Sequence, residues 1–162
     1  WVDGNEGWTS ETLIPNLSTL RENGCTLIEQ PLQRDDWEGM QQLKNINCGM
    51  NLIADESCQH PENVEKSLQF FDGINIKLAK CGGLSPALQM LQSIKKAKKK
   101  VMLGSMCESG PTCNATAHLI PLADFIDIDG PLLLNERIGK GILYDEQLQI
   151  SFQNTFGNGF EL

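Results

Sequence analysis

The sequence lacks several features that identify specialised classes of protein. None of its six cysteines forms a CxxC pair, so a zinc site with finger-like spacing is not expected. No apolar run is long enough to span a bilayer and no signal peptide is recognisable, so we predict no membrane partner. Basic residues are scarce, 13 against 21 acidic ones. The net charge of −8 argues against a nucleic-acid partner, which calls for basic patches.

The cysteines that are present bear on the cellular compartment. Several of the six lie in apolar stretches, where a free cysteine behaves as a small hydrophobic residue. We therefore expect reduced, structural cysteines and a cytoplasmic protein. The length of 162 residues is that of one domain, which could bury a core of its own.

Short apolar runs alternate with amphipathic segments along most of the chain. This alternation, every 20 to 30 residues or so, is typical of parallel strands joined by crossover helices. It predicts strands at 1–3, 25–29, 51–55, 73–77, 100–104 and 124–127, and helices at 10–23, from 35 or 36 onward, from 61 through 68, at 85–98 and at 112–119. Ser10 is expected to cap the first helix, and Leu88, Leu91 and Ile94 to lie on the buried side of helix 85–98.

The strands are continuous apolar runs, as expected where both faces of a sheet are covered. Polar residues gather where each strand gives way to a helix, the face at which β/α barrels carry their chemistry. Six strands are two fewer than a closed barrel needs, and we expect the other two before Trp1. The rhythm stops after Pro131, so residues 1–134 are predicted to form the barrel portion and residues 135–162 a segment that leaves it.

Three acids stand at three successive strand ends. Asp3, Glu29 and Asp55 are 26 residues apart in each step, and each follows an apolar run. A carboxylate at the end of a buried strand is costly to desolvate without a partner. Three oxygen ligands that converge on one point suit Mg²⁺, which keeps other positions for water and substrate. The alternative is that each acid caps the helix that follows it.

Lys77 ends the strand 73–77 and should point into the same mouth as the acids. A lysine beside a divalent cation has a lowered pKa and can act as a base. The alternative is a lysine paired with one of the acids. Lys80 is interpreted as a loop or helix-start cation.

Asp127 and Asp129 form a DxD at the last strand end. Alternate strand residues face the same way, so the two carboxylates invite a cation, either a second metal or a substrate ammonium. Capping of a turn by one of them is the alternative. Glu108 and Ser105 follow the strand 100–104 and should also face the mouth, with their roles open.

Five stretches, in order and at family spacing, resemble the enolase superfamily and its muconate-lactonizing subgroup. They are VDGNEGW (2–8), IEQP (28–31), ADES (54–57), NIKLAKCGG (75–83) and GSMCES (104–109). A sixth, DIDGPL (127–132), is similar to the DxD signature of dipeptide epimerases within that subgroup. The resemblance implies a partial (β/α)7β TIM-like barrel, from the third strand to the eighth. It also implies a separate capping domain to which residues 135–162 return.

The resemblance also implies roles for these residues. Asp3, Glu29 and Asp55 would bind Mg²⁺, which in this superfamily works with a lysine or histidine base and stabilises an enediolate. Lys77 would be the acid or base on one face of the α-carbon. The remaining candidates are the substrate-ammonium ligands Asp127 and Asp129 and three supporting residues, Asn5, Glu56 and Glu108.

A second lysine on the other face of the α-carbon, from a KxK strand, is absent from these residues, as is the cap. We therefore expect an isomerase that is inactive as this chain alone. Its missing N-terminal half would come from the same gene or from another chain, and the complete protein is expected to be a homo-oligomer acting on a small dipeptide. The alternatives are another activity of the subgroup (N-acylamino acid racemase, o-succinylbenzoate synthase or muconate cycloisomerase) or a non-catalytic fragment that folds against another chain.

Overall fold

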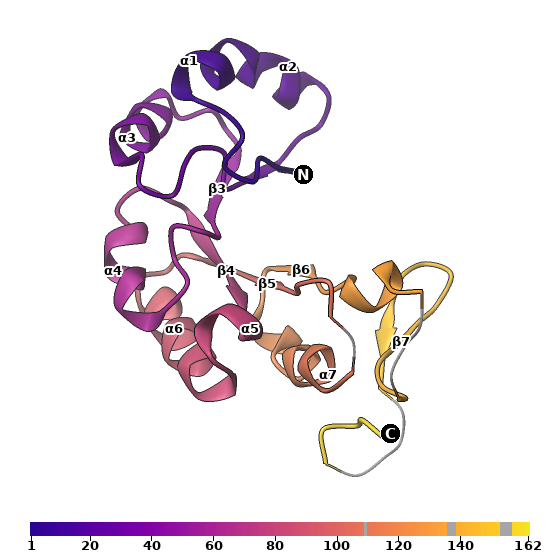
Figure 1. Cartoon of the computed structure of the whole chain (residues 1–162). Helices are drawn as coiled ribbons and strands as arrows, with labels where there is room; N and C mark the ends of the chain where they lie inside the picture. Colours follow the sequence, from indigo (N-terminus) through magenta and orange to yellow (C-terminus); the bar gives the residue numbers. More distant parts are fainter. Residues whose placement is uncertain (109, 136–138, 153–156) are drawn as a thin grey trace.

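The computed structural model describes residues 1–108, 110–135, 139–152 and 157–162. A six-stranded sheet curls through the molecule and helices cover its convex side, so that the chain forms an open arc (Figure 1). The first and last strands are the two edges of this sheet, yet the arc curls far enough that the ring of Trp1 lies 6.2 Å from the ring of Phe125 in the last strand. The predicted α/β half-barrel is confirmed.

The strands lie in the sheet in the order of the sequence, and each pairs in parallel with the next. They are β1 (Val2–Asp3), β2 (Leu27–Glu29), β3 (Asn51–Ala54), β4 (Gly73–Lys77), β5 (Lys100–Gly104) and β6 (Phe125–Asp127). Parallel neighbours require a crossover each time, which explains the alternation seen in the sequence. All six strands were predicted, and β4 and β5 have the predicted bounds.

The crossovers are helical and mostly short. They are α1 (Ser10–Leu13), η1 (Ile14–Asn16), α2 (Leu17–Glu22), α3 (Trp37–Ile46), η2 (Pro61–Asn63), α4 (Val64–Ser67), α5 (Leu78–Cys81), α6 (Leu84–Lys96), α7 (Pro111–Ala117), η3 (Ile120–Leu122) and η4 (Gly130–Leu133). None of the helices described is long and apolar enough to cross a membrane.

The first predicted helix differs from the observed one in two ways. Its cap is Thr9 rather than Ser10, because the Thr9 hydroxyl accepts from the backbone N–H of Thr12 in a reciprocal capping arrangement. The helix is also broken into three pieces at Pro15, which has no N–H to donate and lies in the 3₁₀ turn η1. Leu13 and Leu17 are nevertheless both buried, so the pieces still share one apolar side.

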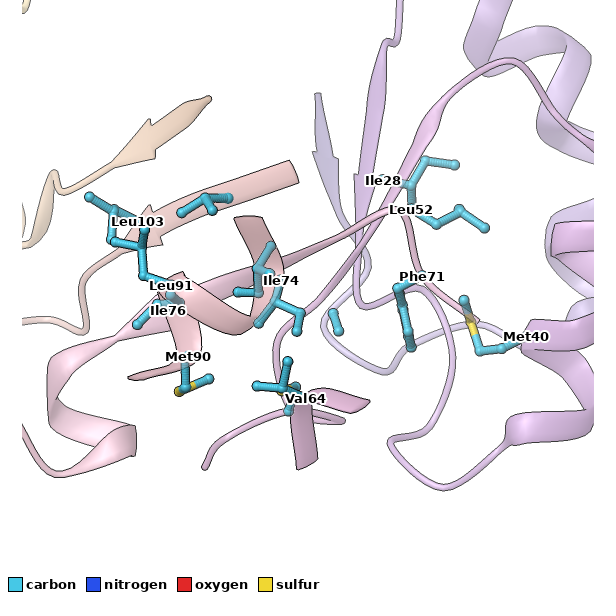
Figure 2. Packing of buried hydrophobic residues seen from close by; sticks show 14 of the residues in the cluster. Ile28, Met40, Leu52, Val64, Phe71, Ile74, Ile76, Met90, Leu91 and Leu103 are labelled. Atoms are coloured by element: carbon cyan, nitrogen blue, oxygen red, sulfur yellow. The ribbon is translucent and has the colours of Figure 1, made fainter. Parts of the chain in front are cut away.

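The main hydrophobic core fills the space between the sheet and the helices. Strand residues that point outward pack against side chains from the helices and loops. Figure 2 shows the strand residues Ile28, Leu52, Ile74, Ile76 and Leu103 together with the helix and loop residues Met40, Val64, Phe71, Met90 and Leu91. Every one of these side chains is buried. The core therefore lies on the convex side and leaves the concave side to other side chains.

Helix α6 buries two of the three residues predicted to face inward, Leu91 and Ile94, but not Leu88. Ala87, Met90, Leu91 and Ile94 are buried, at the spacing of one helical face. Leu88 lies off that face and is 40% exposed, so its predicted burial was wrong. Ala87 and Met90 are apolar, like Leu88, so the spacing of apolar residues alone does not show which of the three are buried.

The C-terminal segment folds back onto the end of the arc. Its strands β7 (Leu143–Tyr144) and β8 (Ile150–Ser151) form an antiparallel hairpin. Ile142 belongs to a small core with Ile128 and with Cys113 of α7. The described part of residues 135–162 thus contacts α7 and the end of β6, and its return to a capping domain stays a prediction.

Candidate active site

The acids come together because of the register of the sheet. Asp3 of β1 is paired with Glu29 of β2, and Glu29 with Ile53 of β3. Paired residues of parallel strands face the same way, and so does the residue two positions on. Asp55 therefore joins Glu29 and Asp3 at the carboxyl end of the sheet, on the face opposite the main core. The predicted clustering of strand-end acids follows from this register.

Lys77 lies between two of the acids. Its Nζ donates to Asp55 Oδ2 at 2.8 Å and lies 3.9 Å from Glu29 Oε1. Burial alone would lower the pKa of Lys77, but the facing carboxylates of Asp55 and Glu29 hold that pKa above its ordinary value. The lysine thus points into the acid cluster, as predicted, and its ammonium form is the one that these carboxylates favour.

Lys80 also lies in the site, although it was interpreted from the sequence as a peripheral cation. Its Nζ is 2.7 Å from Asp55 Oδ1 and 2.8 Å from Glu56 Oε1, and its side chain is only 16% exposed. The one-turn helix α5 directly after β4 brings Lys77 and Lys80 onto the two oxygens of the same carboxylate. A spacing of three residues across a strand-to-helix junction was the signal in the sequence, because such residues share a helical face.

Among the acids described, Glu29 has the pKa that is shifted furthest from its ordinary value. Burial, followed by its neighbours Asp55 and Asp3, raises the pKa of Glu29 to about 7, against the opposing effect of a hydrogen bond from Asn75. That bond, from Asn75 Nδ2 to Glu29 Oε1, measures 2.6 Å. The other amide atom, Asn75 Oδ1, is buried without a hydrogen-bond partner among the described residues. Asn75 was not predicted as a site residue, and its inward position on β4 follows only from the register.

Two of the three predicted supporting residues lie beside the acids. The Asp3 carboxylate accepts from the backbone N–H of Asn5 at 2.8 Å, and Asn5 has a φ of 43°, in the left-handed region that Asn tolerates better than most residues. Glu56 holds Lys80 with one oxygen, while its Oε2 is buried without a partner in the described part of the chain. Asn5 thus contacts the predicted ligand Asp3, and Glu56 contacts Lys80, which itself binds the predicted ligand Asp55.

The donors at this end of the sheet suit a hard divalent cation in their chemistry. They are carboxylate oxygens, the ligands that Mg²⁺ prefers. The neighbours that raise the pKa of Glu29 are themselves acids, and a cation would relieve that repulsion. Among the residues described, no three His, Cys, Asp or Glu side chains are arranged so that they could hold a metal ion, and both oxygens of Asp55 bind lysines. That Asp3, Glu29 and Asp55 share one ion stays a prediction.

Asp127 and Asp129 stand on the other side of Lys77. The register pairs Lys77 with Gly104 and Gly104 with Asp127, so all three lie at one level of the sheet. Burial and then the neighbouring Asp129 raise the pKa of Asp127, while Lys77 opposes the rise. The two aspartates line a cavity of about 440 Å³ whose other walls include Trp1 and Leu132.

Glu108 lies in the loop after β5, within electrostatic reach of Lys77. Burial raises the pKa of the Glu108 carboxyl, against the Met106 N–H and the Lys77 ammonium. Ser105, in the same loop, accepts from the backbone N–H of Gly130 at 3.0 Å and so holds the turn after Asp129. Ser109, the last residue of the GSMCES stretch, lies outside the described residues.

Comparisons with known proteins agree with this geometry. A family model described as Enolase C-terminal domain-like matches residues 1–162. An L-Ala-D/L-amino acid epimerase from Maribacter sp. is 44% identical over 161 residues, which are 99% of this chain and 48% of that protein. The chain thus spans about half the length of the curated relatives it matches.

Solved structures of dipeptide epimerases are also similar to this chain. A substrate-liganded L-Ala-D/L-Glu epimerase from Bacillus subtilis is 30% identical with a TM-score of 0.88, covering 98% of this chain and 46% of the other. A dipeptide epimerase from Cytophaga hutchinsonii, in complex with Mg and the dipeptide D-Ala-L-Val, is 28% identical with a TM-score of 0.89, covering 98% and 45%.

Proposed function

The chain belongs to the enolase C-terminal domain-like family, and from that membership we propose that it supplies half of the active site of a Mg²⁺-dependent dipeptide epimerase. The observation that carries the proposal is the position of Lys77, whose ammonium lies between the carboxylates of Asp55 and Glu29 at the carboxyl end of the sheet. An amine held there can exchange a proton with a substrate, and the acids around it can neutralise a cation.

The reaction we propose is proton transfer at the α-carbon of one residue of a dipeptide. Lys77 Nζ, when neutral, removes the α-proton from one face, and as ammonium it returns a proton to that same face. Asp3, Glu29 and Asp55 would hold Mg²⁺, whose charge would make the α-proton of a bound carboxylate more acidic. The nearby carboxylates keep Lys77 within reach and favour its charged form, which is the form that returns the proton.

Asp127 and Asp129 are proposed to bind the α-ammonium of the dipeptide. Asp127 lies at the level of Lys77 two strands away, on β6, and Asp129 follows it in the turn after that strand. A charge-assisted contact to an ammonium is among the stronger polar contacts available. Such a contact would offset the repulsion that, after burial, raises the pKa of Asp127. It would also select free dipeptides over N-acylated amino acids, which have no ammonium to bind.

The proposal includes parts that lie outside this chain. A lysine on the opposite face of the α-carbon and a domain that closes the site would come from the other half of the protein, as the length of the relatives suggests. We propose that the barrel portion is residues 1–134 and that residues 135–162 lead toward that domain. By this proposal the chain alone is inactive, and the complete protein is a cytoplasmic homo-oligomer.

A hybrid protein tests the function. The 161 matched residues of the Maribacter epimerase, 44% identical to this chain, are replaced by those of this chain, and the hybrid is incubated with a dipeptide library in D₂O. We expect deuterium at one α-carbon of at least one dipeptide, detected by mass spectrometry, and loss of that exchange when EDTA removes the metal. A folded hybrid that labels no dipeptide would contradict the proposal.

A second experiment tests the ammonium site. Asp127→Asn and Asp129→Asn are introduced together, which keeps the size of both side chains and removes their charge. We expect dipeptide exchange to fall by two orders of magnitude or so, since the charge-assisted contact to the substrate ammonium is lost. Intact dipeptide turnover in this variant, or turnover of N-acyl amino acids by the unmodified hybrid, would favour another activity of the subgroup.

A further inference from the structure

A buried glutamine joins two of the acid-bearing strand ends. Gln30 follows Glu29 directly, and its side chain has no exposed surface. Its Oε1 accepts from the backbone N–H groups of Asp55 at 3.0 Å and Ser57 at 3.1 Å. Its Nε2 donates to the Leu32 carbonyl at 2.9 Å and to Ser57 Oγ at 2.8 Å. One carboxamide therefore satisfies four groups, one of which is the backbone N–H of the predicted metal ligand Asp55.

The backbone at Gln30 is held in an unusual conformation. Its φ is 30°, in the left-handed region that a non-glycine residue adopts only where its surroundings impose it. This turn lets the Gln30 side chain reach across to the segment after β3 while Glu29, one residue earlier, keeps its place in the sheet. One side chain thus links the two acid-bearing strand ends in addition to the pairing of β2 with β3.

The same network extends to the loop after Asp3. Ser57 Oγ donates to the Arg34 carbonyl at 2.9 Å. The Arg34 guanidinium binds Glu6 through two hydrogen bonds, of 3.0 Å and 2.7 Å, and the Arg34 N–H donates to Glu6 at 2.8 Å. The loops after β1, β2 and β3, one for each acid, are therefore connected by contacts that do not use the acids themselves.

We propose that Gln30 is a positioning residue for the acid cluster. Its carboxamide fixes the backbone of Asp55 relative to Glu29, and through Ser57 and Arg34 this hold reaches the loop after Asp3. The inference rests on the proposed function only in that the positioned acids bind Mg²⁺. Metal ligands depend on such outer contacts, whose loss usually weakens metal binding by about 10- to 100-fold.

Titration of the 162-residue chain with Mg²⁺, followed by calorimetry, tests the proposal. Gln30→Met keeps the length of the side chain and removes all four hydrogen bonds, and we expect Mg²⁺ to bind at least about ten-fold more weakly. The matched control is Asn114→Leu, because Asn114 is also a buried amide that bridges two segments, through Ile142 N–H and the Asn158 carbonyl, but lies away from the acids. Equal Mg²⁺ affinity in the Gln30 variant and the unmodified chain would overturn the proposal.

Amide hydrogen exchange supplies a readout that does not depend on the metal. In the unmodified chain the N–H groups of Asp55 and Ser57 should exchange slowly, and in Gln30→Met both should exchange at least about ten-fold faster, with the strand amides of β4 unchanged. Ser57→Ala is a second variant, for the case in which Gln30→Met does not fold. It leaves both hydrogen bonds to Gln30 Oε1 in place, so the Asp55 amide should stay protected.

The two readouts separate the possible failures. If neither the unmodified chain nor the hybrid protein binds Mg²⁺, the proposed function fails, while the exchange rates still decide the role of Gln30. Gln30 does not position Asp55 if Gln30→Met folds and leaves the Asp55 amide protected. The same conclusion follows if the Asp55 amide of Ser57→Ala exchanges as fast as it does in the unfolded chain.

Discussion

The two faces of the curled sheet are built by the same strands but carry different side chains. On the convex face, strand residues such as Ile74 and Ile76 pack under the helices, and all are apolar (Figure 2). On the concave face, apolar residues such as Ile53 and Met102 lie toward the amino end, and charged or amide residues such as Lys77 follow at the carboxyl end. Along β4, apolar residues that face the convex side alternate with charged or amide residues that face the concave side.

This difference shows how one strand can serve folding and chemistry at once. A side chain on the convex face loses only packing when it is shortened, whereas one at the carboxyl end of the concave face loses a charge that its neighbours were arranged around. Substitutions on the two faces should therefore separate: one set should change stability and the other activity. The predictions below test that separation, beginning with the largest expected effect.

Replacement of Lys77 should abolish α-proton exchange from one stereoisomer of the substrate. General acid–base groups contribute about 10²- to 10⁴-fold to rate, so we expect a loss of that size for Lys77→Ala in the hybrid protein. Lys77→Arg is the matched control, because it keeps a cation beside Asp55 but does not give up its proton. If Lys77→Arg retains exchange, the lysine acts by charge alone and its assignment as acid or base is wrong.

Ile74→Ala on the convex face should have the opposite pattern. Ile74 has no exposed surface, and such a truncation of a buried isoleucine costs about 3–4 kcal/mol of unfolding free energy. Urea unfolding followed by circular dichroism measures that loss. Exchange per folded molecule should stay within about two-fold of the unmodified hybrid, because Ile74 points away from the acids. A large loss of exchange in the folded variant would mean that the two faces are coupled.

Most of the fold could be predicted from the sequence because the convex face is uniformly apolar. Six apolar runs separated by helical spacing fix the number, the order and the parallel direction of the strands. Details within helices were harder to predict. Pro15 divides the first helix, and Leu88 is exposed because Ala87 and Met90 of α6 are buried in its place. Such choices depend on the shape of the neighbouring surface, which one sequence does not show.

The candidate site was predicted less completely. The acids and Lys77 could be found because each ends an apolar run. Lys80 was assigned outside the site, since its contact with Asp55 depends on the short helix α5. Gln30 and Asn75 were not singled out, because a neutral amide inside a strand-end motif has no charge to explain. Amides that organise charged groups are recognised by their contacts rather than by their type.

The pKa of Glu29 predicts how the stability of the metal-free chain depends on pH. Burial raises this pKa from 4.5 to about 7, so the folded chain binds a proton that the unfolded chain releases between those values. The unfolding free energy should therefore rise as the pH is lowered from about 7 to about 4.5, and this contribution, about 3 kcal/mol, is lost again as the pH returns through 7.

Glu29→Gln should remove that part of the pH dependence, which is measured as the difference between the two unfolding curves at each pH. Saturating Mg²⁺ should remove it as well, because a metal ligand must be ionised. If the two chains show the same pH dependence without metal, Glu29 does not titrate near pH 7, and its burial beside the other acids raises its pKa less than the structure indicates.

Lys100→Met tests the comparison at the rim of the sheet and should have the smallest effect. Lys100 Nζ lies 3.0 Å from Asp124 Oδ1, a distance close to that of Lys80 from Asp55, but the Lys100 and Asp124 side chains are 49% and 26% exposed. Asp124 also keeps the N–H of Val101 at 2.9 Å when Lys100 is removed. Exposed pairs contribute about 0.5 kcal/mol or less, so urea unfolding should barely change. A cost above about 1 kcal/mol would show that charge also supports the fold outside the concave face, because the exposed pair would then be worth more than its screening by water allows.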